Sequence, residues 1–295
     1  MDDYIVTGIT QDGFFRYFAA SATQTVSEAQ RRQDTWSAAS AALGRTLIAT
    51  SLLSAAGLKN ADDMLTVRIK GDGPVGAIVV DGTSQGTVRG YVDNPHVTLP
   101  LNLVGKIDVA KAVGTHGILA VTKDLGLGEP FTGQVPLVSG ELGEDFAYYL
   151  ATSEQVPAAI GVSVFVNADN TIGVAGGFMV QALPGATDEA LKNLESNVKT
   201  LPLVSELLKA GVTPEQIADR IFGAGELNII DRQPLSYKCT CSKEHFGDIM
   251  ATLPKKDLQA MIDEDGGAEA ICKFCGNKYE FSVADLEALM QKNTD

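Results

Sequence analysis

All four cysteines of this chain lie within its last 57 residues, as Cys239-Thr-Cys241 and Cys272-Lys-Phe-Cys275. Two close thiol pairs separated by a helix-length insert can supply two ligands each to a tetrahedral Zn²⁺ ion. The pattern therefore predicts one Zn²⁺ per chain in the reduced state, with Cys239, Cys241, Cys272 and Cys275 as its ligands. A unit of about sixty residues with few large apolar side chains is marginal alone, so we expect the metal to stabilise its fold.

The rest of the chain indicates the compartment in which these thiols are kept. No cysteine occurs before Cys239, no apolar signal segment follows the acidic start Met1-Asp2-Asp3, and no uninterrupted apolar run approaches about eighteen residues. We therefore expect a soluble cytoplasmic protein that has no membrane partner. Because thiols stay reduced in the cytoplasm, zinc binding or a redox role explains the cysteines better than structural disulfides do.

Composition and charge narrow the class of protein. The 295 residues are 45% hydrophobic and 6% aromatic, which is ordinary for a globular protein with one large core and a smaller unit. The formal net charge of -14 argues against a nucleic-acid partner, because affinity for phosphates comes largely from Lys and Arg.

The first part of the chain, residues 1–183, is expected to be an α+β domain. Short strand-like runs separated by turn signals dominate it, and a helical stretch at residues 26–58, with a break near Thr35-Trp36, interrupts them. The expected strands are residues 4–10, 14–20, 65–70, 76–80, 87–92, 118–123, 133–138, 160–166 and 171–181. Strands around one packing helix are typical of an α+β fold rather than of a repeating βαβ array.

Residues 184–233 are expected to form a short helical linker. Amphipathic helices are predicted at residues 188–199, 203–210 and 213–221. The last has Thr213 as its N-cap, Pro214 at its first position and Gln216 completing a capping box. Helices of this length are marginal alone, so the linker must pack on a neighbouring apolar surface.

Residues 234–295 are expected to form a small C-terminal α+β unit that binds the zinc. Helices are predicted at residues 242–253 and 255–263, and a hairpin at residues 269–272 and 278–281 encloses the second cysteine pair. Ser282 is the predicted cap of a final helix that ends at Gln291.

The sequence contains no convincing motif for catalysis or nucleotide binding. Gly71-Asp-Gly73-Pro-Val-Gly76 matches a dinucleotide pattern, but Pro74 removes an N–H donor and strand-like residues follow where a helix should open. A hairpin turn is the better interpretation. His96, His116 and His245 are scattered, and four thiolates already saturate a tetrahedral ion. We expect no enzymatic activity.

The cysteine pattern by itself allows two functions. A purely structural zinc would suit a constitutive adaptor or a nucleic-acid ribbon, and the acidic charge disfavours the second. The Cys-x-Cys spacing favours a redox role, because neighbouring thiolates can close as a disulfide once an oxidant converts one to a sulfenic acid. Oxidation of the four cysteines would then expel the metal.

The whole chain resembles a known family, the bacterial redox-regulated heat-shock chaperones of 33 kDa. The resemblance covers both cysteine pairs and further segments in the expected order from end to end. These segments are Gln30-Arg31-Arg32, Thr35-Trp36, residues 39–46 and 71–76, Ala112-Val113-Gly114, Thr132-Gly133-Gln134-Val135 and Ser139-Gly140-Glu141-Leu142. The cysteine pattern shows no departure from that of the family.

What the resemblance implies is an ATP-independent holdase. In that family the reduced, zinc-bound form is inactive. Oxidative stress with heat forms two disulfides between neighbouring cysteines, releases zinc, and unfolds the zinc unit with the linker. The apolar surface exposed in this way captures unfolding or oxidatively damaged client proteins, and a homodimer on activation is implied as well. A metal-dependent unit beside marginal helices is a two-state element, so the interpretation from the residues agrees.

Overall fold

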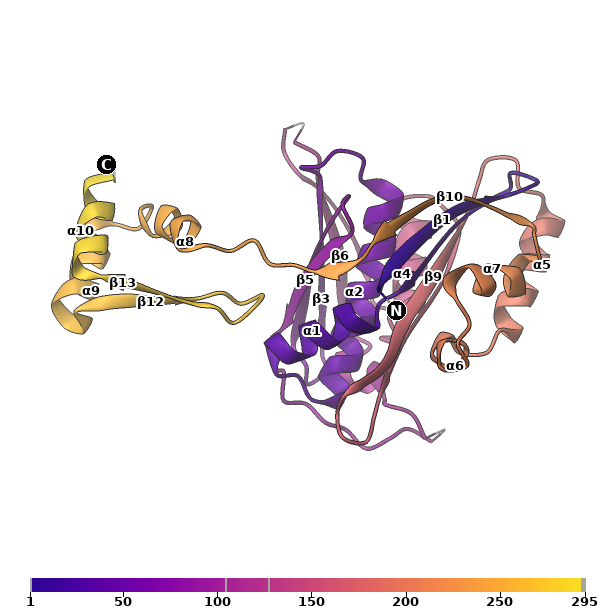
Figure 1. Ribbon diagram of the computed structural model, residues 1–295, viewed down its shortest axis with the longest axis horizontal. Coiled ribbons are helices and arrows are strands. Elements are labelled where there is room, and N and C mark those ends of the chain that lie inside the picture. Colours follow the sequence, from indigo (N-terminus) through magenta and orange to yellow (C-terminus); the bar gives the residue numbers. More distant parts are fainter. Residues whose placement is uncertain (1, 104, 127, 293–295) are drawn as a thin grey trace. The chain divides into compact units, whose positions relative to one another are not determined.

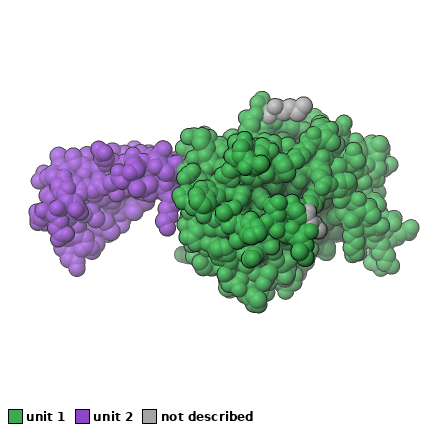
Figure 2. All heavy atoms as spheres, turned by 90° about the horizontal axis from the view of Figure 1, so that it is seen from below, with its two compact units in different colours: residues 1–238 green, residues 239–295 purple. Residues whose placement is uncertain are grey.

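The computed structural model of the chain describes residues 2–103, 105–126 and 128–292. Two compact units make up the chain, Met1–Lys238 and Cys239–Asp295, which Figure 2 distinguishes by colour. The first unit therefore contains both the expected core domain and the expected linker.

Two sheets form the framework of the first unit (Figure 1). One has the strand order β10-β1-β2-β9-β8. Its strands are β1 (Tyr4–Thr10), β2 (Phe15–Ser21), β8 (Ala158–Val166), β9 (Ile172–Ala182) and β10 (Leu227–Pro234). The other has the order β11-β5-β4-β3-β6-β7. Its strands are β3 (Met64–Gly71), β4 (Ala77–Thr83), β5 (Thr87–Val92), β6 (Gly117–Asp124), β7 (Phe131–Pro136) and β11 (Ser236–Tyr237). The nine strands expected from the sequence are all present with small shifts at their ends, which confirms the α+β class.

The helix α2 (Ser37–Gly57) lies between the two sheets and forms the centre of the core (Figure 1). Its small residues allow close packing: at Gly44, an added Cβ would lie 2.7 Å from a side-chain carbon of Val26. By length and composition α2 could cross a membrane, but 89% of an apolar 18-residue stretch within it is buried in the fold. Such burial is typical of the core helix of a globular protein.

The long helical stretch breaks where the sequence predicts. The helix α1 (Thr23–Gln33) ends at Asp34, whose φ of 49° lies in the left-handed region and stops the helix. The arginines of this stretch form ion pairs, Arg31 and Arg32 with Glu28, and Arg45 with Glu141.

Three linker helices pack on one face of the sheet that contains β1 (Figure 1). They are α5 (Asp188–Thr200), α6 (Val204–Lys209) and α7 (Pro214–Phe222). The predicted capping box of α7 is present, because Gln216 N–H donates to the Thr213 side chain and the Gln216 side chain accepts from Thr213 N–H.

An apolar cluster, here called the linker cluster, lies between these helices and the sheet. Its buried sheet residues are Val6, Phe15, Tyr17, Ala19, Phe178 and Val180, and its buried linker residues are Val204, Leu207, Ile217, Ala218 and Ile221. The folded linker therefore covers apolar sheet surface, as the marginal length of its helices requires.

Residues 184–233 contain the three expected helices and, in addition, a strand that was not expected. The segment Leu227–Pro234 forms β10 because β1 offers it backbone partners that no local pattern reveals. The short helices α3 (Val109–Val113) and α4 (Gly143–Thr152) were also not expected. Elements this short have too little hydrophobic periodicity to be recognised in a sequence.

The glycine-rich segment between β3 and β4 is a turn, as expected. A Cβ added to Gly71 would overlap the carbonyl oxygen of Val113, and one added to Gly73 would overlap that of Ala112. The glycines therefore serve a close backbone approach and leave no space there for a pyrophosphate.

The second unit consists of a hairpin and three helices in its described part. Its elements are α8 (Lys243–Met250), α9 (Lys255–Asp265), β12 (Gly267–Ile271), β13 (Lys278–Ser282) and α10 (Val283–Lys292). Its buried apolar core, apart from the cysteines, is Met250, Leu258, Phe281, Leu286 and Leu289. A core of this size agrees with the expectation that a metal stabilises the unit.

Candidate metal centre

The four cysteine sulfurs of the second unit meet in one cluster. All four Sγ atoms lie within 4.8 Å of one another. The Sγ atoms of Cys239 and Cys272 are 3.7 Å apart, and those of Cys241 and Cys275 are 3.3 Å apart. Among the described residues, no other group of three or more Cys, His, Asp or Glu side chains is arranged to hold a metal ion.

The hairpin and the segment before α8 position the two pairs. Cys239 and Cys241 lie between β11 and α8, Cys272 directly follows β12, and Cys275 lies in the turn that leads to β13. Gly276 closes this turn by donating its N–H to the Cys272 carbonyl oxygen at 2.8 Å. The φ of Gly276 is 72°, a conformation that favours glycine because it has no Cβ.

The donor set and its spacing fit Zn²⁺. In a tetrahedral site with Zn–S bonds of about 2.3 Å, neighbouring sulfurs are about 3.8 Å apart. The Cys239–Cys272 distance of 3.7 Å lies close to this value, and the Cys241–Cys275 distance of 3.3 Å is shorter. An all-thiolate site also favours zinc over magnesium or calcium, which prefer oxygen ligands. The four-cysteine cluster is therefore suited to zinc binding.

The thiols differ in how readily they lose a proton before a metal binds. Burial raises the pKa of the Cys275 thiol to about 12 and also raises the pKa of Cys272. Burial also opposes ionisation of Cys241, but hydrogen bonds with Tyr279 and the other cysteines outweigh it and lower the pKa of Cys241 to about 7. Cys241 thus ionises more easily than Cys272 or Cys275, and a cation is needed to hold those two as thiolates at neutral pH.

Tyr279 is a residue of this centre that the sequence analysis missed. Its hydroxyl lies 3.2 Å from Cys241 Sγ and donates to the Cys241 carbonyl oxygen at 3.0 Å. The ring packs against Phe246 with 5.4 Å between ring centroids. The only signal in the sequence is the position of Tyr279 on the hairpin arm after Cys275, which does not distinguish it from any other strand tyrosine.

The histidines lie outside the cysteine cluster, in agreement with the sequence analysis. His245 is exposed in the first turn of α8, where its N–H donates to the Ser242 side chain. His96 contacts Asp34 at 2.8 Å, and His116 lies 3.4 Å from Asp72, both in the first unit.

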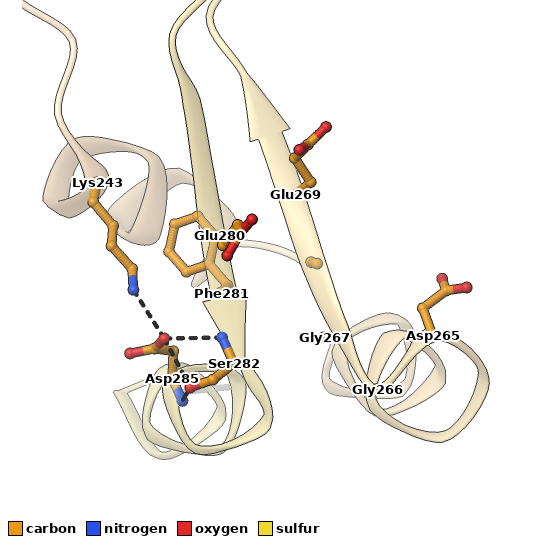
Figure 3. A pocket seen from close by; sticks show the side chains of 10 residues that line it. Lys243, Asp265, Gly266, Gly267, Glu269, Glu280, Phe281, Ser282 and Asp285 are labelled. Carbon is orange, nitrogen blue, oxygen red and sulfur yellow. Dashed lines mark hydrogen bonds and ion pairs between the residues drawn. The ribbon is translucent and has the colours of Figure 1, made fainter.

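An open groove of about 630 Å³ in the second unit lies apart from the cysteines. Figure 3 shows Lys243 and Ser282 directed toward Asp285 at one end of the groove. Hydrogen bonds from these two residues lower the pKa of Asp285 to about 2. Glu269, on β12, is paired with Lys278 at 3.2 Å. These charges fix the start of α10 and the hairpin, so they already have structural roles.

Known proteins match the chain along nearly its whole length. Residues 3–282 match the family model described as Hsp33 protein. The chain is 74% identical over 293 residues to the 33 kDa chaperonin of Lacticaseibacillus casei (strain BL23), which covers 99% of this chain and 100% of that protein. Its identity to the 33 kDa chaperonin of Listeria innocua serovar 6a is 53% over 294 residues, with 99% of each chain covered.

A solved structure shows the same fold. The crystal structure of the 33 kDa chaperonin (heat shock protein 33 homolog) from Thermotoga maritima matches with a TM-score of 0.91 at 39% identity, and the match covers 99% of both chains.

Proposed function

The chain belongs to the Hsp33 family of 33 kDa chaperonins, and we propose that Cys239, Cys241, Cys272 and Cys275 are both its zinc ligands and its redox switch. Members of the family are cytoplasmic bacterial chaperones that hold unfolding client proteins under redox control, and they are not enzymes. The observation that carries the proposal is the convergence of all four sulfurs within 4.8 Å.

In the reduced state the four sulfurs would hold the metal and keep the second unit folded. Bound Zn²⁺ would supply binding free energy on the order of 10 kcal/mol or more, and would keep all four sulfurs as thiolates. The hydroxyl of Tyr279 orients Cys241, and the Gly276 turn fixes Cys272 against Cys275. These contacts support a preformed site, because they position the sulfurs before any ligand arrives.

Oxidation by peroxide converts these thiols to disulfides in two steps for each bond. A thiolate sulfur attacks one peroxide oxygen, the O–O bond breaks, and a sulfenic acid forms as hydroxide leaves and takes up a proton to become water. A second thiolate attacks the sulfenic sulfur, the S–S bond forms as the S–O bond breaks, and the leaving hydroxide takes up a proton to become a second water. Each disulfide transfers two electrons to one peroxide, so the centre consumes about two peroxides per chain.

We expect the disulfides to join neighbours, Cys239 with Cys241 and Cys272 with Cys275. The two short distances in the folded cluster instead join cysteines of different pairs, so static proximity does not favour neighbours. Once the first oxidation weakens the site, the unit loosens, and the thiol two or three residues away is then the closest partner on average.

Loss of the metal would release the linker and expose the client surface. We propose that residues 1–183 stay folded, that residues 184–233 act as the releasable linker, and that residues 234–295 act as the switch. Support comes from the linker cluster, where linker side chains cover Phe15, Tyr17 and Phe178 of the sheet. An apolar face of this kind is a suitable surface for unfolding proteins once it is uncovered.

Self-association of the activated chain is a further part of the proposal. The same apolar face, when uncovered, would favour a homodimer by burying surface between two copies. Sedimentation of the oxidised protein at increasing concentration should show a dimer that the reduced protein does not form.

A peroxide titration of the reduced, zinc-loaded protein tests the proposal. We expect zinc release, loss of free thiols and suppression of aggregation of a heat-unfolded client to rise together, with about one zinc and four thiols lost per chain. Peptide mapping should find mainly the two neighbour disulfides. Full chaperone activity with the metal still bound would exclude the switch, and would favour a constitutive structural zinc.

A further inference from the structure

The strand β10 is held in the sheet by little besides its backbone. None of its eight residues is buried, and six are exposed. Only Leu227 contributes to the linker cluster. The main side-chain anchor of β10 is Arg232, whose Nε donates to Glu215 of α7 at 2.7 Å. An element with so few apolar contacts opens at low cost, and this one loses its anchor if α7 leaves.

The neighbouring strand β1, unlike β10, has buried side chains and should remain in place. Ile5 and Val6 are 1% and 0% exposed, and β1 pairs along its other edge with β2. If β10 leaves, β1 therefore becomes the edge of a folded sheet, with a row of unpaired backbone groups.

The register shows which backbone groups of β1 would be uncovered. Leu235 N–H donates to the Asp3 carbonyl oxygen, and Gln11 N–H donates to that of Glu226. In an antiparallel pair the bonded residues alternate along a strand. The N–H and C=O groups of Ile5, Thr7 and Ile9 therefore face β10, whereas those of Val6 and Gly8 face β2.

We propose that in the activated chain this edge of β1 binds an extended segment of the client protein by strand addition, in the place that β10 vacates. The inference rests on the linker release proposed above, and it adds where the client binds and in what conformation. This edge of β1 already accepts an extended chain, because β10 pairs with it from Tyr4 to Thr10, with one register shift between Thr7 and Gly8.

At the position of Arg232, the neighbouring side chains favour an apolar client residue over the arginine of β10 once the linker has gone. Arg232 pairs with Val6 in the register and so points to the face of the linker cluster, where it depends on Glu215 for its charge partner. Without α7, this position lies beside the uncovered apolar face of Val6 and Tyr17. An apolar side chain gains free energy there and an arginine does not. The preferred client segment is therefore extended, with apolar residues at alternate positions.

Residue-resolved hydrogen exchange of the full-length protein tests the proposal, with carboxymethylated α-lactalbumin as a permanently unfolded client. The amides of Ile5, Thr7 and Ile9 should be protected in the reduced state. Their protection factors should fall at least about tenfold on oxidation, and should rise again when the client is added. The amides of Val6 and Gly8 are the matched control, because they pair with β2 and should stay protected throughout.

The outcomes separate this inference from the proposed function. If the linker opens and the client is held while the Ile5, Thr7 and Ile9 amides stay unprotected, strand addition is wrong and the switch stands. If β10 stays protected after oxidation although the client is held, both the linker release and this inference fail. If protection returns without client as the protein concentration rises, a second copy of the chain occupies the edge and the client assignment is overturned.

A peptide of residues 227–234 provides an independent measurement. Added to the oxidised protein, it should displace the client in a concentration-dependent manner. N-methylation at Asp231 removes an N–H that faces Thr7 of β1 and should reduce competition at least about tenfold. The same change at Arg232, whose N–H faces outward, should leave competition nearly unchanged. Equal competition by the two methylated peptides would contradict strand addition.

Discussion

At the scale of single residues, the pKa values of the cysteines determine how zinc affinity depends on pH. Burial raises the pKa of Cys275 to about 12 and raises that of Cys272, so both thiols are protonated in the metal-free cluster at neutral pH. Both protons must leave when the metal binds, and acidification therefore weakens binding. Zinc affinity should fall at least about 100-fold for each pH unit below 8, because two or more protons compete. Chelator competition at pH 6, 7 and 8 measures this slope, and a change below tenfold per unit would mean that these thiols are not the ligands.

Tyr279 offers a second prediction at this scale. The change Tyr279→Phe removes the hydroxyl that contacts Cys241 Sγ and its carbonyl oxygen. Partners of this kind orient metal ligands, so zinc affinity should fall roughly tenfold. The matched control is Tyr237→Phe, which removes a hydroxyl bonded to Gly90 in the other unit and should not change the affinity. Equal affinities of the Tyr279 variant and the wild type, by chelator competition, would show that the hydroxyl does not support the site.

At the scale of elements, one carboxylate connects the linker to the sheet. Glu215 of α7 accepts hydrogen bonds from Tyr4 on β1 and from Arg232 on β10, at 2.8 and 2.7 Å. Burial by itself would raise the pKa of Glu215, but these bonds and its own backbone contact lower it. The carboxylate is therefore charged at neutral pH, and its hydrogen bonds connect α7 with β1 and β10.

The change Glu215→Gln should loosen the linker while the metal is still bound. The ion pair between Glu215 and Arg232 is partly exposed, so its loss should destabilise the folded linker by only about 1 kcal/mol. This raises the population of chains with an open linker roughly fivefold. Hydrogen exchange of α7 amides should accelerate by that factor, and the peroxide dose for activation should fall. The control is Glu195→Gln in α5, which removes an exposed pair with Lys199. If the α7 amides exchange at the same rate in both variants, the Glu215 carboxylate does not hold the linker on the sheet.

At the scale of the whole molecule, the segment after β10 connects the two units along the chain. Leu235 is 4% exposed, Ser236 N–H donates to the Gly86 carbonyl oxygen, and Lys238 N–H donates to that of Val88. These contacts belong to the first unit, which ends at Lys238. They restrain the end of β10 within the first unit while the linker is folded.

Two truncations that differ by four residues test this connection. A chain ending at Pro234 lacks the anchor, meaning the contacts of residues 235–238 with the first unit, and it also lacks the second unit. The linker of this chain should open and hold clients without oxidant. A chain ending at Lys238 keeps these contacts, so β10 should open less often and the chain should be several-fold less active than the shorter one, while it should still be more active than the reduced full-length protein. The chaperone activity of both chains is measured by how far each suppresses the aggregation of a heat-unfolded client. Equal activity of the two chains would show that the anchor does not restrain the linker.

The sequence by itself determined the features that depend on local pattern. Residue types and spacing were enough to predict that the four cysteines form a cluster suited to zinc, because Cys-x-Cys and Cys-x-x-Cys each place two sulfurs close together whatever the rest of the fold does. Strand-like runs between turn signals identified β1 to β9, and the capping residues Thr213 and Gln216 identified the start of α7. The redox-regulated chaperone function came from the resemblance of the whole chain to a family, since no catalytic motif was present.

Only the tertiary structure decided how distant segments meet. The exposed strand β10 depends on pairing with β1, more than two hundred residues earlier in the chain, and no local propensity identifies such a partner. The contact of Tyr279 with Cys241 requires the hairpin to fold back on the first cysteine pair. The cover of the linker over Phe15 and Tyr17 likewise depends on long-range packing. Non-local contacts of this kind arise from burial and backbone pairing across the fold, which the local order of residues does not encode.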